Sequence, residues 1–93
     1  MVLGQRRFVV QQRVPELTHA ELVSLHTAVE AATRRLRANG RDVICLDAFY
    51  LPATEQWIAV FAADAVHSVR RAMAMAQLGP AAIHEAVATS LVR

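Results

Sequence analysis

Two short apolar segments in the middle of the chain predict a β-hairpin. Residues 43–50 and 56–62 are shorter than a typical helix and are rich in the β-branched and aromatic side chains that favour strands. The turn between them contains Pro52, which fixes its own φ angle and cannot donate a hydrogen bond to a neighbouring strand. We therefore predict two antiparallel strands joined at residues 51–54.

An alternating segment and an amphipathic helix come before this hairpin. Residues 7–14 alternate between two sets of side chains and predict a first strand. Thr18 and Glu21 have the spacing of a capping box, which marks the start of a helix. The helix is expected to end near Ala38, because Gly40 readily takes the left-handed conformation that stops a helix. Its apolar residues are spaced by three and four: Leu22, Leu25, Val29, Ala32 and Leu36.

A second helix and a last strand follow the hairpin. Asp64 is the expected N-cap of this helix, and Gly79 followed by Pro80 is its expected end. Residues 83–92 predict a strand, although their alanine content leaves a helix as a competing interpretation. The apolar residues of the second helix are Ala62, Val66, Val69, Met73 and Ala76.

The predicted order of elements is strand, helix, strand, strand, helix, strand. With right-handed crossovers, this order gives an α+β, ferredoxin-like sandwich in which two helices cover one face of a four-stranded antiparallel sheet. We expect residues 1–93 to form a single domain of this kind.

Both central strands are apolar on both of their faces. In the second strand, Ile44, Leu46, Ala48 and Tyr50 alternate with Val43, Cys45, Asp47 and Phe49. In the third, Trp57, Ala59 and Phe61 alternate with Ile58, Val60 and Ala62. Strands that are apolar on both sides need cover on both sides. Because the helices cover one face, we predict a homodimer, an α+β barrel-like assembly in which a second copy covers the other face.

Composition and charge narrow the classes of partner. Ten basic residues, all arginine, and eight acidic residues leave a net charge of +2, which is weak support for phosphate binding. No aromatic stacking platform and no recognition-helix motif accompany the arginines, so nucleic acid is not a favoured partner. No apolar run reaches the roughly twenty residues that span a bilayer, and the first residues lack the features of a signal peptide. We therefore expect a cytoplasmic protein without a membrane partner, and the single cysteine excludes an internal disulfide.

Asp47 is the first candidate for chemistry, because a buried carboxylate must be paired, hydrogen-bonded or protonated. We expect Asp47 to share a face with Cys45 and with Arg13 of the first strand. One interpretation is a structural ion pair between Arg13 and Asp47 at the dimer face. The other makes Asp47 a base or metal ligand in an apolar cleft. The predicted ligand pocket of this cleft comprises Arg13, Phe49, Tyr50 and Trp57.

The four histidines do not predict a metal site by their spacing. His19 and His26 are expected to lie about 10 Å apart along the first helix, which is too far for one metal ion. We interpret both as residues at the edge of the apolar stripe, and His67 as solvated. His84, in the last strand, is the best further member of a site assembled from different elements. It forms our pair of catalytic candidates with Asp47.

From Arg7 to about Val87, the chain resembles a family of small bacterial ferredoxin-like proteins that includes a dimeric nickel-binding protein. The resemblance lies in the order of elements, in the proline before the first helix, and in the step from Gly79 to Pro80. It implies the same fold and a homodimer, with a divalent metal as a candidate cofactor. Family members carry histidines where this chain has Asp47 and Ala74, so we carry no metal ligand over.

Three functions fit these predictions. The first is a small homodimeric binding protein for a metal ion such as nickel or for a small apolar ligand. The alternative is a cofactor-free isomerase, cyclase or monooxygenase that acts on an aromatic or polyketide-like substrate in a cleft on the open sheet face, which rests on fold analogy. The third is a structural interaction module.

Overall fold

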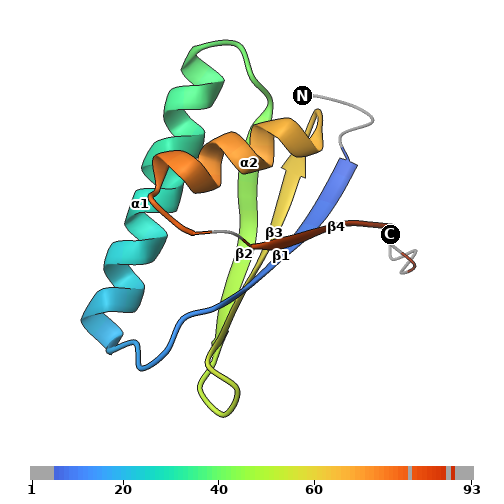
Figure 1. Cartoon of the computed structure of the whole chain (residues 1–93). Coiled ribbons are helices and arrows are strands. Elements are labelled where there is room, and N and C mark those ends of the chain that lie inside the picture. The colour runs from blue at the N-terminus through green and yellow to red at the C-terminus, as the bar shows by residue number, and fades with distance from the viewer. Residues whose placement is uncertain (1–5, 80, 88, 90–93) are drawn as a thin grey trace.

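The elements follow one another in the predicted order (Figure 1). The computed structural model of the chain describes residues 6–79, 81–87 and 89. Its described strands are β1 (Arg6–Arg13), β2 (Val43–Leu51), β3 (Gln56–Ala63) and β4 (Ala82–Ala86), and its described helices are α1 (His19–Ala38) and α2 (Val66–Met75). They form a ferredoxin-like α+β fold, which confirms the fold class predicted from the sequence.

The sheet has the strand order β2-β3-β1-β4, and its neighbouring strands are antiparallel. β2 and β4 are therefore its edge strands. Figure 1 shows α1 and α2 on the same side of the sheet, and α1 contacts β2 while α2 contacts β3. The opposite side, here called the open face, is covered by no other element in the part of the chain that the structure describes.

The predicted capping box fixes the start of α1. The Thr18 hydroxyl accepts a hydrogen bond from the backbone N–H of Glu21 at 3.1 Å, and the Glu21 carboxylate accepts one from the N–H of Thr18 at 2.8 Å. At the other end, Asn39 is the C-cap and Gly40 has a φ of +88°, as predicted. Among the described residues, neither helix is both long enough and apolar enough to cross a bilayer.

α2 differs from its prediction at both ends. Its N-cap is Ala65, and the Asp64 carboxylate instead accepts a hydrogen bond from the Ser68 hydroxyl at 2.6 Å. After the helix, Gln77 takes the left-handed conformation with a φ of +60°, two residues before Gly79. The chain therefore turns out of α2 earlier than the glycine and proline had indicated.

The last strand is shorter than predicted. β4 ends at Ala86, and Val87 is already outside the strand and 83% exposed. Positions 88 and 90–92 of the predicted strand lie outside the described residues. The part of β4 that is described pairs only with β1.

The core fills the space between the helices and the sheet. β3 alternates as predicted, with Trp57 and Phe61 buried on the helix side and Ile58 and Val60 half-buried on the open face. Burial of such apolar side chains is the main stabilising contribution in a small domain. The buried apolar residues are Phe8, Val10, Val29, Ala32, Leu36, Val43, Trp57, Ala59, Phe61, Ala62, Ala63, Val69, Ala72 and Met73.

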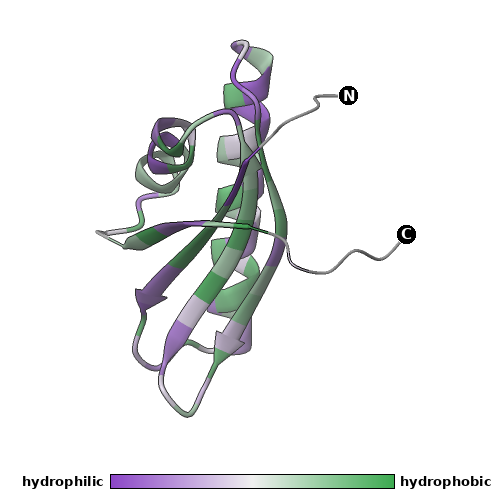
Figure 2. Cartoon of the chain, turned by 90° about the vertical axis from the view of Figure 1, so that its right-hand side faces the viewer, coloured by the Kyte–Doolittle hydropathy of each residue, from purple (hydrophilic) through white to green (hydrophobic). Residues whose placement is uncertain are grey.

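The open face carries an apolar area on β2 and β3. Ile44, Phe49 and Leu51 of β2 are 40%, 53% and 44% exposed, beside Ile58 and Val60 of β3. Figure 2 shows the sheet with α1 behind it and no helix in front of the described strands. A single chain thus leaves large apolar side chains in contact with water.

We expect Thr18→Ala to lower the free energy of unfolding by about 1 kcal/mol, because the first turn of α1 loses its side-chain acceptor. Thr27→Ala, at an exposed position inside the same helix, is the matched control. It should leave stability unchanged or slightly higher, since alanine favours helix more than threonine does. Urea unfolding followed by circular dichroism measures both, and equal losses would contradict the capping role of Thr18.

Candidate functional site

A β-bulge in β2 determines which of its side chains face the helices. Cys45 pairs with Phe61 and Asp47 pairs with Val60, so Leu46 is the extra residue between them. Cys45 therefore lies on the helix side of the sheet, whereas Asp47 lies on the open face. The prediction that these two residues share a face is wrong, because it assumed an uninterrupted alternation along the strand.

The bulge changes the assignment of the whole strand. The helix side holds Val43, Cys45, Ala48 and Tyr50, and the open face holds Ile44, Asp47, Phe49 and Leu51. Two local hydrogen bonds accompany the bulge. The Asp47 Oδ1 accepts one from the backbone N–H of Ala48 at 3.0 Å, and the Cys45 thiol donates one to the Asp47 carbonyl oxygen at 3.5 Å. The exposed Asp47 carboxylate is thus hydrogen-bonded to the backbone of its own strand.

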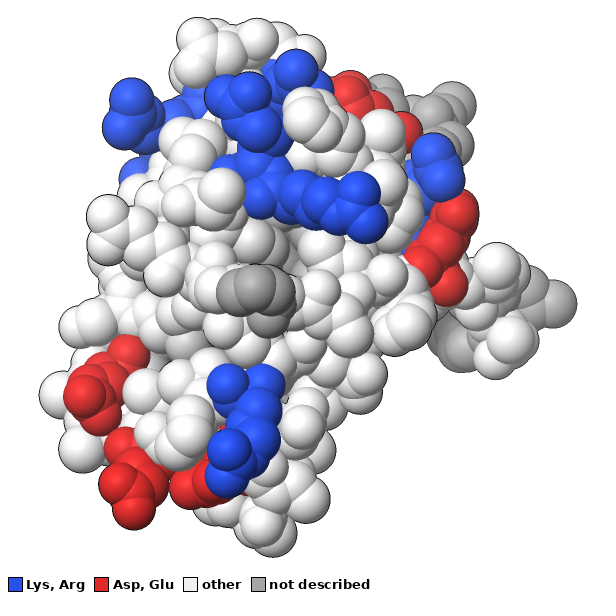
Figure 3. Space-filling view, in the orientation of Figure 1, with Lys and Arg blue, Asp and Glu red and all other residues white. Residues whose placement is uncertain are grey.

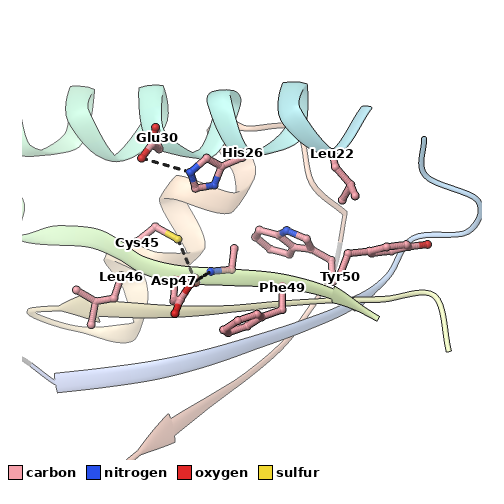
Figure 4. A pocket seen from close by; sticks show the side chains of 10 residues that line it. Leu22, His26, Glu30, Cys45, Leu46, Asp47, Phe49 and Tyr50 are labelled. Carbon is pink, nitrogen blue, oxygen red and sulfur yellow. Dashed lines mark hydrogen bonds and ion pairs between the residues drawn. The ribbon is translucent and has the colours of Figure 1, made fainter. Parts of the chain in front are cut away.

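α1 presents a row of side chains to this part of β2. Leu22, His26 and Glu30 are spaced by four residues and so lie on one side of the helix. The His26 Nε2 lies 3.4 Å from a carboxylate oxygen of Glu30. Figure 4 shows both side chains extending from α1 towards β2. This pair supplies a polar group that can both donate and accept a hydrogen bond.

A pocket of about 440 Å³ lies between this side of α1 and β2 (Figure 4). Its volume is typical of sites that bind small molecules. The Tyr50 hydroxyl donates a hydrogen bond to the Val14 carbonyl oxygen at 2.7 Å, so the ring and not the hydroxyl is free to contact a ligand. The polar residues that line the pocket are His26, Glu30, Cys45 and Asp47. The apolar ones are Leu22, Leu46, Ala48, Phe49, Tyr50 and Trp57.

Burial raises the pKa of the Cys45 thiol to about 11. The hydrogen bond to the backbone of Asp47 opposes this shift, and the negative charges of Glu30 and Asp47 add to it. The thiol is therefore protonated at pH 7. Because nucleophilic attack needs the thiolate, Cys45 contributes packing and a weak hydrogen-bond donor to the pocket.

The described residues contain no group of three or more histidine, cysteine, aspartate or glutamate side chains placed to hold a metal ion. In the pocket, His26 and Glu30 are paired with each other, and Cys45 retains its proton. The arrangement combines polar and apolar residues around one cavity, which suits recognition of a small organic molecule.

Four of the predicted site residues, Asp47, Phe49, Tyr50 and Trp57, lie along this pocket. Arg13 does not. Its guanidinium donates a hydrogen bond to the Glu55 carboxylate at 2.7 Å. The predicted ion pair between Arg13 and Asp47 is therefore not formed within the chain.

His84 is also absent from the pocket. It lies on the open face in the same row as Asp47, because Asp47 pairs with Val60, Val60 with Val9, and Val9 with His84. Three strand spacings of about 4.8 Å place the two residues roughly 14 Å apart. One chain does not bring the two catalytic candidates together.

Sequence analysis missed the contribution of α1 to this site. His26 was interpreted as an edge residue of an amphipathic helix, and Glu30 was assigned no role in a site. The spacing of Leu22, His26 and Glu30 by four residues was the available signal. It became informative only once α1 was seen to contact the edge strand β2.

Comparison with known proteins supports the fold. No family model matches the chain, and no curated protein matches it. A solved structure that it resembles is that of SCO4226 from Streptomyces coelicolor A3(2), with a TM-score of 0.77 and 21% sequence identity. The likeness covers 90% of this chain and 99% of that one. At this level of identity it shows the fold alone, and this fold is the one that the family resemblance implied.

The pKa of Cys45 can be tested by the pH dependence of its alkylation by iodoacetamide. We expect the rate in the folded protein to rise with a midpoint near pH 11, because burial disfavours the thiolate. The same chain in urea is the control, and its midpoint should fall near the ordinary cysteine value of about 8.5. Since Cys45 is the single cysteine, the signal has one source. Equal midpoints in the two states would contradict its burial.

Proposed function

We propose that the protein is a homodimeric binding protein that takes a small, largely apolar ligand between α1 and β2. The observation that carries the proposal is the pocket of about 440 Å³, whose lining includes the aromatic residues Tyr50 and Trp57 on the helix side of the sheet. Aromatic walls with a few polar groups are typical of small-molecule sites. His26 and Glu30, at the polar edge, would fix the orientation of one polar group of the ligand.

The apolar open face supports the dimer. Four strands about 4.8 Å apart and about eight residues long, at about 3.3 Å per residue, present roughly 500 Å² in projection. Ile44, Phe49 and Leu51 are exposed on this face. The apolar part of the face lies on β2 and β3, and exposed apolar patches on a protein surface mark sites of interaction. A second copy offers a face of the same shape and the same apolar character.

The charges of the open face suit a two-fold arrangement. Asp47 lies on the edge strand β2, whereas Arg7 and Arg13 lie on β1 and His84 on the opposite edge. In a two-fold interface each contact occurs twice with the roles exchanged, so Asp47 of each copy can meet a cation of the other. Because Asp47 and Phe49 belong to both the open face and the pocket, the second copy would also cover the outer side of the pocket.

The alternative of a cofactor-free enzyme has less support. Acid–base chemistry on the open face would need two titratable groups within reach of one substrate atom. Asp47 and His84 lie at opposite edges of that face in one chain.

Phe49→Asp should convert the dimer into a monomer, because it places a charge in the apolar part of the proposed interface. Val23→Asp is the matched control, since Val23 is 52% exposed, against 53% for Phe49, but lies on α1. Sedimentation equilibrium should give twice the 10.2 kDa of one chain for the unmodified protein and for the control, and 10.2 kDa for Phe49→Asp. A monomeric unmodified chain would overturn the dimer.

Ligand binding can be followed through Trp57, which is the single tryptophan and lines the pocket. We expect titration with the aromatic probe 2-naphthol to change the fluorescence of Trp57 in a saturable manner. Ala48→Leu fills the pocket and should weaken binding by about tenfold, or about 1.4 kcal/mol. Ala53→Leu, in the exposed turn between β2 and β3, should leave it unchanged. Equal affinities in both variants would place the ligand elsewhere.

The same titration with nickel or zinc distinguishes a site for an apolar small molecule from a site for a metal ion. The proposal expects neither ion to change the fluorescence of Trp57 or to raise the midpoint of thermal unfolding. Saturable nickel binding without a response to 2-naphthol would replace the apolar ligand with the metal that the family resemblance implies.

A further inference from the structure

We propose a second binding surface on the helix layer: the groove between α1 and α2 docks an acidic amphipathic helix of a partner protein. The groove has a volume of about 520 Å³. Its floor includes Ala32 and Leu36, which are buried, and its opposite wall includes Met75 of α2. Arg35 and Arg71 line it as well, one from each helix, and both are exposed.

The floor of this groove suits a helix. Besides Leu36, the residues that α1 contributes to it are mainly alanines, at positions 28, 31 and 32. Helix axes pack about 8–10 Å apart, and small side chains at the contact permit the closest approach. An amphipathic helix binds such a groove through apolar residues spaced by three and four.

The two arginines that line the groove, Arg35 and Arg71, form no ion pair with a described carboxylate. In the described part of the chain, the arginines that form ion pairs are Arg6 and Arg13. Arg37 donates a hydrogen bond to the Val43 carbonyl oxygen. The arginine cluster, defined as Arg34, Arg35, Arg37, Arg41, Arg70 and Arg71, forms no ion pair with any described carboxylate.

Figure 3 shows this segregation of charge on the helix side of the molecule. The basic side chains gather towards the top, where the C-terminal end of α1 meets α2, and many of the acidic ones lie towards the bottom. Like charges held together repel one another in the free protein. The arginine cluster therefore favours a partner that brings negative charge.

Stabilisation of the helix ends explains the positions of only some of these arginines. Arg35 and Arg37 lie in the last turn of α1, where positive charge stabilises the negative end of the helix. The last turn of α2 holds no basic residue, and Arg70 and Arg71 lie in its middle. Arg71 lines the groove, where a carboxylate from a docked helix would pair with it.

A helix fits this surface better than a nucleic acid does. Neither α1 nor α2 contains a phenylalanine, tyrosine or tryptophan on which a base could stack. A phosphate backbone would contact the arginines but leave the accessible apolar side chains of Ala28, Ala31 and Met75 uncovered. A helix with an apolar stripe and flanking glutamates matches both features.

The test is the binding of a fluorescein-labelled helical peptide with leucines spaced by three and four and glutamates beside them, measured by fluorescence anisotropy. The unmodified protein should bind it in a saturable manner, and more weakly as salt increases. The double variant Arg35→Glu with Arg71→Glu should lose at least about tenfold in affinity. The control, Arg34→Glu with Arg70→Glu, makes the same charge change one residue away on each helix, outside the groove, and should lose far less.

Three results would overturn the proposal: no saturable binding to the unmodified protein, equal losses in the two double variants, or tighter binding of a labelled DNA duplex than of the peptide. Circular dichroism checks that each variant is folded, which is expected because all four positions are exposed. If the glutamate variant of Arg35 and Arg71 does not fold, Arg35→Gln with Arg71→Gln tests the same contacts and should also weaken binding.

Discussion

A four-stranded sheet has two faces, and α1 and α2 cover only one of them in the part of the chain that the structure describes. Burial of apolar surface contributes about 25 cal/mol per Å². A single chain therefore lacks the stabilisation that burial of three partly exposed side chains would give, those of Ile44, Phe49 and Leu51. A small domain needs such stabilisation. Pairing of two such faces would recover it. These exposed apolar side chains are the reason for proposing the dimer. The second copy would also cover the outer side of the pocket.

The bulge in β2 lets one strand serve both the core and the open face. With an uninterrupted alternation, Asp47 would face the helices beside Cys45, where burial of a carboxylate is costly. The extra residue, Leu46, turns Asp47 outwards while Cys45 stays half-buried. The same local change places Phe49 at the junction of the pocket and the open face. The side-chain arrangement of β2, the pocket and the proposed interface therefore all depend on this one bulge.

Several features determined by neighbours in the sequence could be predicted, although the two ends of α2 could not, and features determined by packing were missed. The capping box of Thr18 and the alternation of β3 are local, and both were predicted correctly. The bulge depends on how β2 pairs with β3, and the partner of Arg13 is Glu55, 42 residues away. The aromatic wall of the pocket was visible as apolar strand residues. Its polar edge on α1 was not, because it depends on which strand α1 covers.

In the proposed dimer, a second copy stabilises the folded chain by covering its open face. Thermal unfolding of the unmodified protein over about a thousandfold range of concentration is the sharpest test, since unfolding coupled to dissociation depends on concentration. The midpoint of unfolding should rise by several degrees as the protein concentration increases. A midpoint that stays constant over the whole range would show that one chain is stable alone and would contradict the proposed dimer.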